Sequence, residues 1–340
     1  MKKYTAIAIL LATLGLCSCE ERFELEGVNG EPRMFVECYA GLTDTTYVRL
    51  YKAMPVNAKA SDGDDFTLKR MEFKVNGAPL TLHRDEISLF WTPDPIPAGS
   101  EISITVETKE APKVIASSTV PAKTAFSVDA SVMVLPPILD EDMLSYICFK
   151  LKFPGGVAPT DHFGVSILEY DQIHRDDGSE DTDYTFSQAP TSVTVGEINL
   201  GDMATEDFIE SRRLSVLGYN GAINYAACSG EEFPDGEVNA YMMYSGYEPT
   251  WKEYKWDDEG EEIIDSVTVT RTTRFQVQVL KFADESFGYL NSVYNRQTNY
   301  FSMLGFSPPT IAYTNVSGGY GVLGGISLSE SDIIDAADLL

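Results

Sequence analysis

Apolar and polar residues alternate along much of the chain after residue 33, which is the period of a β-strand with one buried face. Such runs occupy residues 34–39, 47–51, 71–75, 87–91, 101–106 and 114–120. Clusters of Gly, Pro and Asp separate the runs, and Asn76-Gly77 is a strong hairpin-turn signal. Short strands at this spacing predict a β-sandwich of immunoglobulin or transthyretin type over residues 33–121.

A second strand-rich region follows the break at Pro121-Ala122-Lys123. Strand-like runs return at residues 126–135, 146–151, 163–168, 238–247 and 267–282. The charged segments 171–183 and 257–262 are expected to be exposed hairpin loops, and residues 203–213 could form a short helix. The predicted fold class is therefore mostly β, with a β-sandwich over 33–121 and a second β-sandwich domain over 122–340.

The period changes from two to between three and four at residues 284–301, which predicts one late helix in the second domain. Phe287, Leu290, Tyr294, Gln297 and Phe301 fall at steps of three and four, as one helical face does. Asp284 stands where a side chain caps the first turn. We expect this helix to pack on a sheet.

Glycine is unusually dense in the segment after this helix, from Thr314 to Gly325. Glycines permit positive φ angles and a close approach of backbones. No Lys-Ser or Lys-Thr pair follows them, so a phosphate-binding loop is a poor fit. The segment predicts a tight turn that enters a closing strand.

The first residues have the pattern of a signal peptide. Lys2 and Lys3 precede an apolar run, residues 6–16, which is shorter than the ~20 residues of a membrane-spanning helix. The block Leu16-Cys17-Ser18-Cys19 then resembles the lipobox of bacterial lipoproteins. Cys19 is the expected lipidation site, because Cys17 would place bulky Leu16 just before the cut. Residues 1–18 would be the signal peptide and 19–32 a tether to the membrane.

Composition limits the possible partners. The chain has a formal charge of -27, with 44% hydrophobic and 11% aromatic residues. An acidic surface repels nucleic acid and anionic headgroups, so membrane attachment would come from the lipid. The charge fits solubility, or else a cationic or calcium-dependent partner. The three remaining thiols, Cys38, Cys148 and Cys228, suggest no disulfide framework.

Catalytic and metal-binding patterns are missing from the sequence. No Gly-x-Ser-x-Gly elbow and no paired His or Cys spacing accompanies His83, His162 and His174, of which the last two are expected in loops. The carboxylates of 171–183 and of the turn 61–65 depart from a calcium loop. We expect no catalytic residue, no metal site, no cofactor and no enzymatic activity.

Aromatic residues gather in one short segment beside an acidic loop: Tyr244, Tyr247, Trp251, Tyr254 and Trp256. Tyr and Trp offer large contact area at low entropic cost, so this segment is a candidate ligand- or partner-binding patch. The alternative is that alternate residues of the segment pack inward.

The lipobox, the sandwich that opens near Phe35, and the motif from Thr314 to Gly325 together resemble one Bacteroidota lipoprotein family. It is classified as a domain of unknown function, family 4249. Members of this family tend to be encoded beside TonB-dependent receptors. Glu20 and Glu21, directly after the expected lipidation site, also resemble the surface-export signal of such lipoproteins. The resemblance implies an outer-membrane location and carries no catalytic residues.

Three functions remain open at this point. The first is a lipid-anchored binding or accessory subunit of a TonB-dependent outer-membrane receptor, on either face of that membrane. The second is a fimbrillin-like adhesin subunit, which would need a removable first strand or an exposed groove. The third is a metal-assisted hydrolase built on His162 or His174.

Overall fold

The protein is largely β-sheet, as the alternation predicts. The computed structural model describes residues 32–53, 66–135, 144–178, 182–188, 193–195, 212–218, 221–244, 249–256, 263–299 and 312–339. These residues form one twelve-stranded sheet, two four-stranded sheets and one α-helix late in the chain. The expected lipidation site, the tether through residue 31 and most of 203–213 lie outside the described residues. No described helix is long and apolar enough to cross a membrane.

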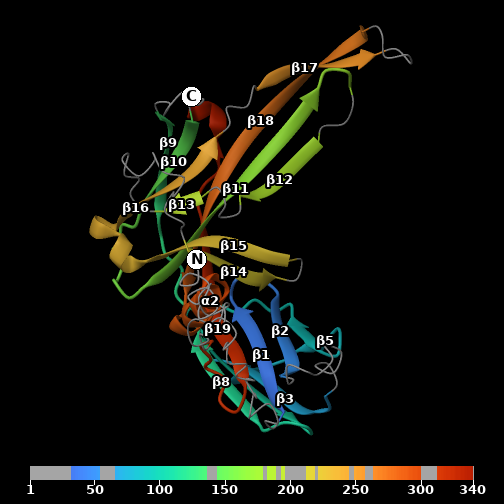
Figure 1. The fold of residues 1–340 in the computed structure, drawn as a ribbon, viewed down its shortest axis with the longest axis vertical. Coiled ribbons are helices and arrows are strands. Elements are labelled where there is room, and N and C mark those ends of the chain that lie inside the picture. The colour runs from blue at the N-terminus through green and yellow to red at the C-terminus, as the bar shows by residue number, and fades with distance from the viewer. Residues whose placement is uncertain are drawn as a thin grey trace, which may run out of the picture.

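Two facing sheets form the N-terminal sandwich (Figure 1). One is made of β1 (Arg33–Ala40), β2 (Thr46–Ala53), β6 (Leu89–Thr92) and β5 (His83–Arg84), and the other of β4 (Ala78–Leu80), β3 (Leu68–Val75), β7 (Glu101–Thr108) and β8 (Val114–Thr119). Val36, Leu50, Phe73 and Ile104 are each at most 1% exposed and lie in the core between the sheets. Their burial at every second position is what the sequence pattern requires.

A strand from the end of the chain completes this sandwich. The first half of β19 (Tyr320–Glu330) runs parallel to β1, from the pair Phe35 and Tyr320 to the pair Ala40 and Gly325. Its second half pairs antiparallel with the end of β18 (Ile263–Phe282). One strand therefore makes the sheets of the N-terminal and C-terminal halves continuous.

The C-terminal half is a second sandwich. Its part of the long sheet contains β14 (Arg212–Gly218), β15 (Gly221–Ser229), β11 (His162–Arg175), β18 and β19. The facing sheet contains β13 (Val193–Val195), β16 (Glu237–Tyr244), β10 (Leu144–Lys152) and β9 (Ser127–Leu135). Phe149, Phe163 and Phe275 lie in the core between these sheets. Short additions complete this half: β20 (Ile334–Asp335), η3 (Gly230–Glu232), η4 (Pro234–Gly236) and η5 (Ala336–Asp338).

The predicted helix is present as α2 (Asp284–Thr298) and packs on β19. Phe287 and Leu290 face the sheet, as their spacing predicts. The prediction of an Asp284 cap was wrong. Asp284 is the first helical residue, the N-cap is Ala283, and no side chain caps it. Asp284 still lies where the helix dipole favours a negative charge.

Four strands of the twelve-stranded sheet extend beyond the C-terminal sandwich and project from it (Figure 1). They are β12 (Thr182–Gln188), the outer parts of β11 and β18, and β17 (Thr250–Trp256), paired in that order. We call this part of the sheet the arm. The loop predicted at 171–183 is only partly a loop, because β11 continues to Arg175 and β12 begins at Thr182. His162 and His174 also lie in β11 rather than in loops.

Candidate functional site

Three of the five candidate aromatic residues lie at the outer edge of the arm. Trp251, Tyr254 and Trp256 are all on β17. Tyr244 ends β16, where its side chain is not described, and Tyr247 lies outside the described residues. The structure thus places three of the five predicted aromatic residues on a single strand.

Strand alternation divides these three side chains between two faces. Tyr254 and Trp256 are two residues apart and are 53% and 54% exposed. Tyr254 lies beside Ser266 of β18, a neighbour too small to cover its ring. Trp251 instead lies beside Val269, which is fully buried, so Trp251 belongs to the inner face. Both sequence alternatives therefore hold in part: one aromatic packs inward and two face solvent.

An ion pair anchors this edge to the centre of the arm. Arg175, at the end of β11, donates from Nε and Nη2 to the Glu253 carboxylate, each at 3.2 Å. Two parallel bonds fix both position and orientation better than a single contact does. Glu253 shares the inner face with Trp251, so the pair fixes which face of β17 points outward.

Charged residues are buried on the inner face of the arm. The buried carboxylate of Asp171 accepts hydrogen bonds from the Arg271 guanidinium and from the Thr273 hydroxyl, the latter at 2.6 Å. Glu169, also buried, lies 3.6 Å from Arg271. One cation between two buried carboxylates is a structural charge cluster, in which Arg271 compensates part of the buried negative charge. This cluster could not be predicted from the sequence, because its members come from two strands that are far apart in the chain.

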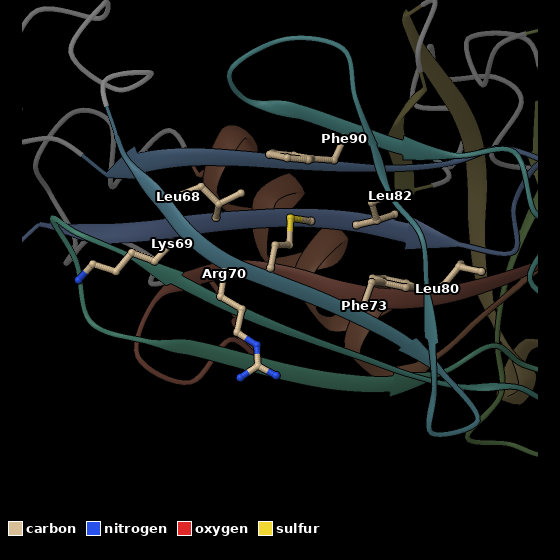
Figure 2. Close-up of a pocket in the computed structure, with 8 residues that line it drawn as sticks. Leu68, Lys69, Arg70, Phe73, Leu80, Leu82 and Phe90 are labelled. Carbon is tan, nitrogen blue, oxygen red and sulfur yellow. The ribbon is translucent and has the colours of Figure 1, made fainter.

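An apolar slot opens between the sheets of the N-terminal sandwich, with a volume of about 270 Å³. Figure 2 shows Leu68 and Phe73 of β3 facing Phe90 of β6 across it, while Arg70 points away. Arg70 pairs instead with Glu72 at 3.1 Å. Phe73 and Phe90 also belong to the buried core, so the slot is an extension of that core between its two sheets.

The three histidines occupy separate places. His83 packs against Trp91 at the edge of the N-terminal sandwich, with ring centroids 4.8 Å apart and the ring planes tilted by 31°. His162 stacks on Phe287 of α2 at 3.8 Å. His174 lies on the arm, roughly 40 Å farther along β11 at ~3.3 Å per residue. Within the described ranges, no three His, Cys, Asp or Glu side chains gather as a metal site would require.

The family described as "Domain of unknown function (DUF4249)" matches residues 20–332. The chain belongs to this family. No curated protein matches the chain. A solved structure entitled "Biofilm associated protein - B domain" is similar at 9% identity and a TM-score of 0.21, over 87% of this chain and 85% of that one. At that TM-score the likeness supports no inference.

The motif that carries the resemblance to DUF4249 has a structural role here. Asn315 joins three segments, because its side-chain amide donates to the carbonyls of Ser117 and Leu323, at 3.1 and 2.8 Å. A Cβ on Gly321, where φ is +99°, would lie 1.9 Å from the carbonyl oxygen of Val36. The glycines of the motif therefore allow β19 to approach β1. The predicted closing strand is confirmed as β19.

The cysteines of this DUF4249 chain behave as small apolar residues. Cys38 and Cys228 are buried, Cys148 is half-buried, and none of these three described residues is in a disulfide. Burial raises the pKa of Cys38 and of Cys148, which keeps both thiols protonated. None of these three residues has the environment of a nucleophile.

Proposed function

We propose that this protein is a lipid-anchored subunit of the cell envelope that binds a partner alongside a TonB-dependent outer-membrane receptor. The lipid would be attached at Cys19, and residues 19–32 would tether the two sandwiches to the outer membrane. The proposal is supported by the lipobox, by the resemblance to lipoproteins encoded beside such receptors, and by the form of the arm.

One observation carries the binding role: Tyr254 and Trp256 are more than half exposed, side by side, on the outer strand of the arm. Aromatic rings left in water on one face of a strand are typical of contact surfaces, since their burial against a partner is favourable. The ion pair of Arg175 and Glu253 fixes that face outward before any partner arrives. A preoriented surface loses less entropy on binding.

The adhesin alternative has less support from the geometry. Donor-strand exchange would need a first strand that can leave the sandwich. In the described residues β1 is the first strand, and it is paired on both sides, with β2 and with β19. Its residues Met34 and Val36 are fully buried. A hydrolase would need convergent catalytic groups, whereas His162 and His174 lie at opposite ends of β11.

Co-purification tests the proposal. The full-length protein, carrying a C-terminal affinity tag, is extracted from its native membrane in mild detergent. We expect a TonB-dependent receptor in the eluate and acyl chains on Cys19 by mass spectrometry. The Cys19→Ser variant should lose the acyl chains and leave the membrane fraction. The double variant Tyr254→Ala with Trp256→Ala should retain less receptor. Reproducible absence of a receptor from the wild-type eluate would overturn the proposal.

A further inference from the structure

The outer strand of the arm has a free edge. β17 pairs with β18 along one side, and no described strand pairs with its other side. In an antiparallel pair, alternate residues direct their backbone N–H and C=O groups away from the partner. Those of β17 point from the free edge toward solvent. Such an edge is a template on which another extended chain can form hydrogen bonds.

The side chains along this edge have a simple order. Lys252, Tyr254 and Trp256 stand at alternate positions of β17 and all three are exposed; the register with β18 shifts between Lys255 and Trp256. Residues two apart on a strand are roughly 6.6 Å apart at ~3.3 Å per residue. On β18, Lys252 lies beside Thr268 and Tyr254 beside Ser266, whereas Trp256 lies beside Ile263. Lys252 and Tyr254 therefore project beyond small polar neighbours, and Trp256 lies beside an apolar one.

We propose that the free edge of β17 binds an extended segment of a protein partner by strand addition. Apolar side chains of the segment pack on Tyr254 and Trp256, and an acidic side chain meets Lys252. Directly opposed side chains on paired strands are close enough for both contacts. The partner's pattern is acidic–x–apolar–x–apolar, in register with β17. This inference rests on the proposed function and specifies the chemistry of the bound partner.

A second copy of this chain fits the edge poorly. Antiparallel pairing of two β17 strands about their centres would place Glu253 opposite the same residue of the second copy. Like charges directly opposite each other destabilise a strand pair. Both copies also carry a formal charge of -27. A segment of another protein can place its acidic residue opposite Lys252 instead, and the repulsion between two Glu253 carboxylates does not arise.

The test uses the purified full-length protein and a fluorescein-labelled peptide of eleven residues, Thr-Val-Thr-Val-Thr-Asp-Thr-Val-Thr-Val-Thr. Its sequence is the same in both directions, so it presents the pattern whether it pairs parallel or antiparallel. A second peptide, Thr-Thr-Thr-Val-Val-Asp-Val-Val-Thr-Thr-Thr, keeps the composition and loses the alternation. Fluorescence anisotropy should show the first peptide binding at least tenfold more tightly than the second.

Three variants identify the surface. Tyr254→Ser combined with Trp256→Ser should weaken binding at least tenfold, while Tyr51→Ser, at an exposed position of β2, should leave it unchanged. Lys252→Asp should also weaken binding, and a peptide with Lys in place of its Asp should restore it. Equal affinity for the two peptides, or binding unaffected by the double variant, would overturn the inference.

Backbone methylation tests the mode of binding. Only one set of alternate N–H groups of an added strand faces β17, so N-methylation of the Val residues and of the Thr residues should have unequal effects. Equal effects would overturn strand addition. So would binding of soluble polysaccharide in place of the peptide, or a dimer in light scattering that the double variant abolishes. Peptide binding without receptor co-purification would remove the proposed function alone, and the reverse result would remove this inference alone.

Discussion

Asn315 binds Leu323 through both ends of its side-chain amide. Its Nδ2 donates to the Leu323 carbonyl at 2.8 Å, and its Oδ1 accepts from the Leu323 N–H at 3.1 Å. The same Nδ2 donates to the carbonyl of Ser117 in β8. One side chain thus supplies three hydrogen bonds where the first half of β19 lies in the N-terminal sandwich. This is the part of the sequence that is most specific to the resemblance, and its role is to join the two halves.

Replacing Asn315 should therefore destabilise the whole protein. A net contribution of about 1 kcal/mol for each of three hydrogen bonds predicts that Asn315→Ala lowers the free energy of unfolding by roughly 3 kcal/mol. Urea denaturation followed by circular dichroism measures this. Asn295→Ala, at an exposed position of α2, is the matched control and should change stability by less than about 0.5 kcal/mol. Equal effects of the two substitutions would contradict the role assigned to Asn315.

Gly321 should not tolerate any side chain. Its φ of +99° disfavours other residues, and a Cβ would lie 1.9 Å from the Val36 carbonyl oxygen. We expect Gly321→Ala to cost about 3 kcal/mol or more, or to prevent folding, because β19 could no longer lie beside β1. Thermal unfolding of the soluble fraction measures the change. Gly155→Ala meets no atom within 4 Å and should unfold near the wild-type temperature.

Local patterns predicted the elements of this fold well. Ile102, Ile104 and Val106 are buried at alternate positions of β7, and Phe287 with Leu290 anchors α2, as their periods require. The pairing of β1 with β19 could not be read from any local pattern, because its register depends on contacts between the two ends of the chain. The dense glycines of residues 314–325 predict a close approach between two backbones. They do not predict that β1 is the partner strand.

The arm shows why the loop prediction for residues 171–175 was wrong. Residues 171–175 contain Asp, His and Arg, a composition typical of an exposed loop. Asp171 is nevertheless buried in a strand, because Arg271 and Thr273 on β18 compensate its charge. The pairing of Asp171 with residues a hundred positions away cannot be predicted from a local sequence pattern. By contrast, the alternation along β17 separates Trp251 from Tyr254, so their division between two faces could have been predicted.

Arg271 should be essential for the stability of the arm. Arg271→Met leaves Glu169 and Asp171 buried without their cation, and we expect a loss of about 3–5 kcal/mol in unfolding free energy. Combining it with Glu169→Gln and Asp171→Asn removes the uncompensated charge and should recover most of the loss. Guanidinium denaturation measures both variants. Arg296→Met, at an exposed position near the end of α2, should be nearly neutral, and failure of the triple variant to recover would contradict this account.

Glu37 makes the stability of the protein depend on pH in a definite direction. Burial raises its pKa above the usual 4.5, although Arg49, 3.9 Å away, and Tyr39 oppose the shift. The folded state therefore holds this proton more tightly than the unfolded chain. The resulting stabilisation is complete below pH 4.5 and is lost as the pH rises through the folded-state pKa. Glu37→Gln keeps a neutral side chain at every pH, so its unfolding free energy relative to wild type should increase from pH 4 to pH 7. Urea denaturation at a series of pH values measures this, and a difference that stays constant or falls with pH would contradict it.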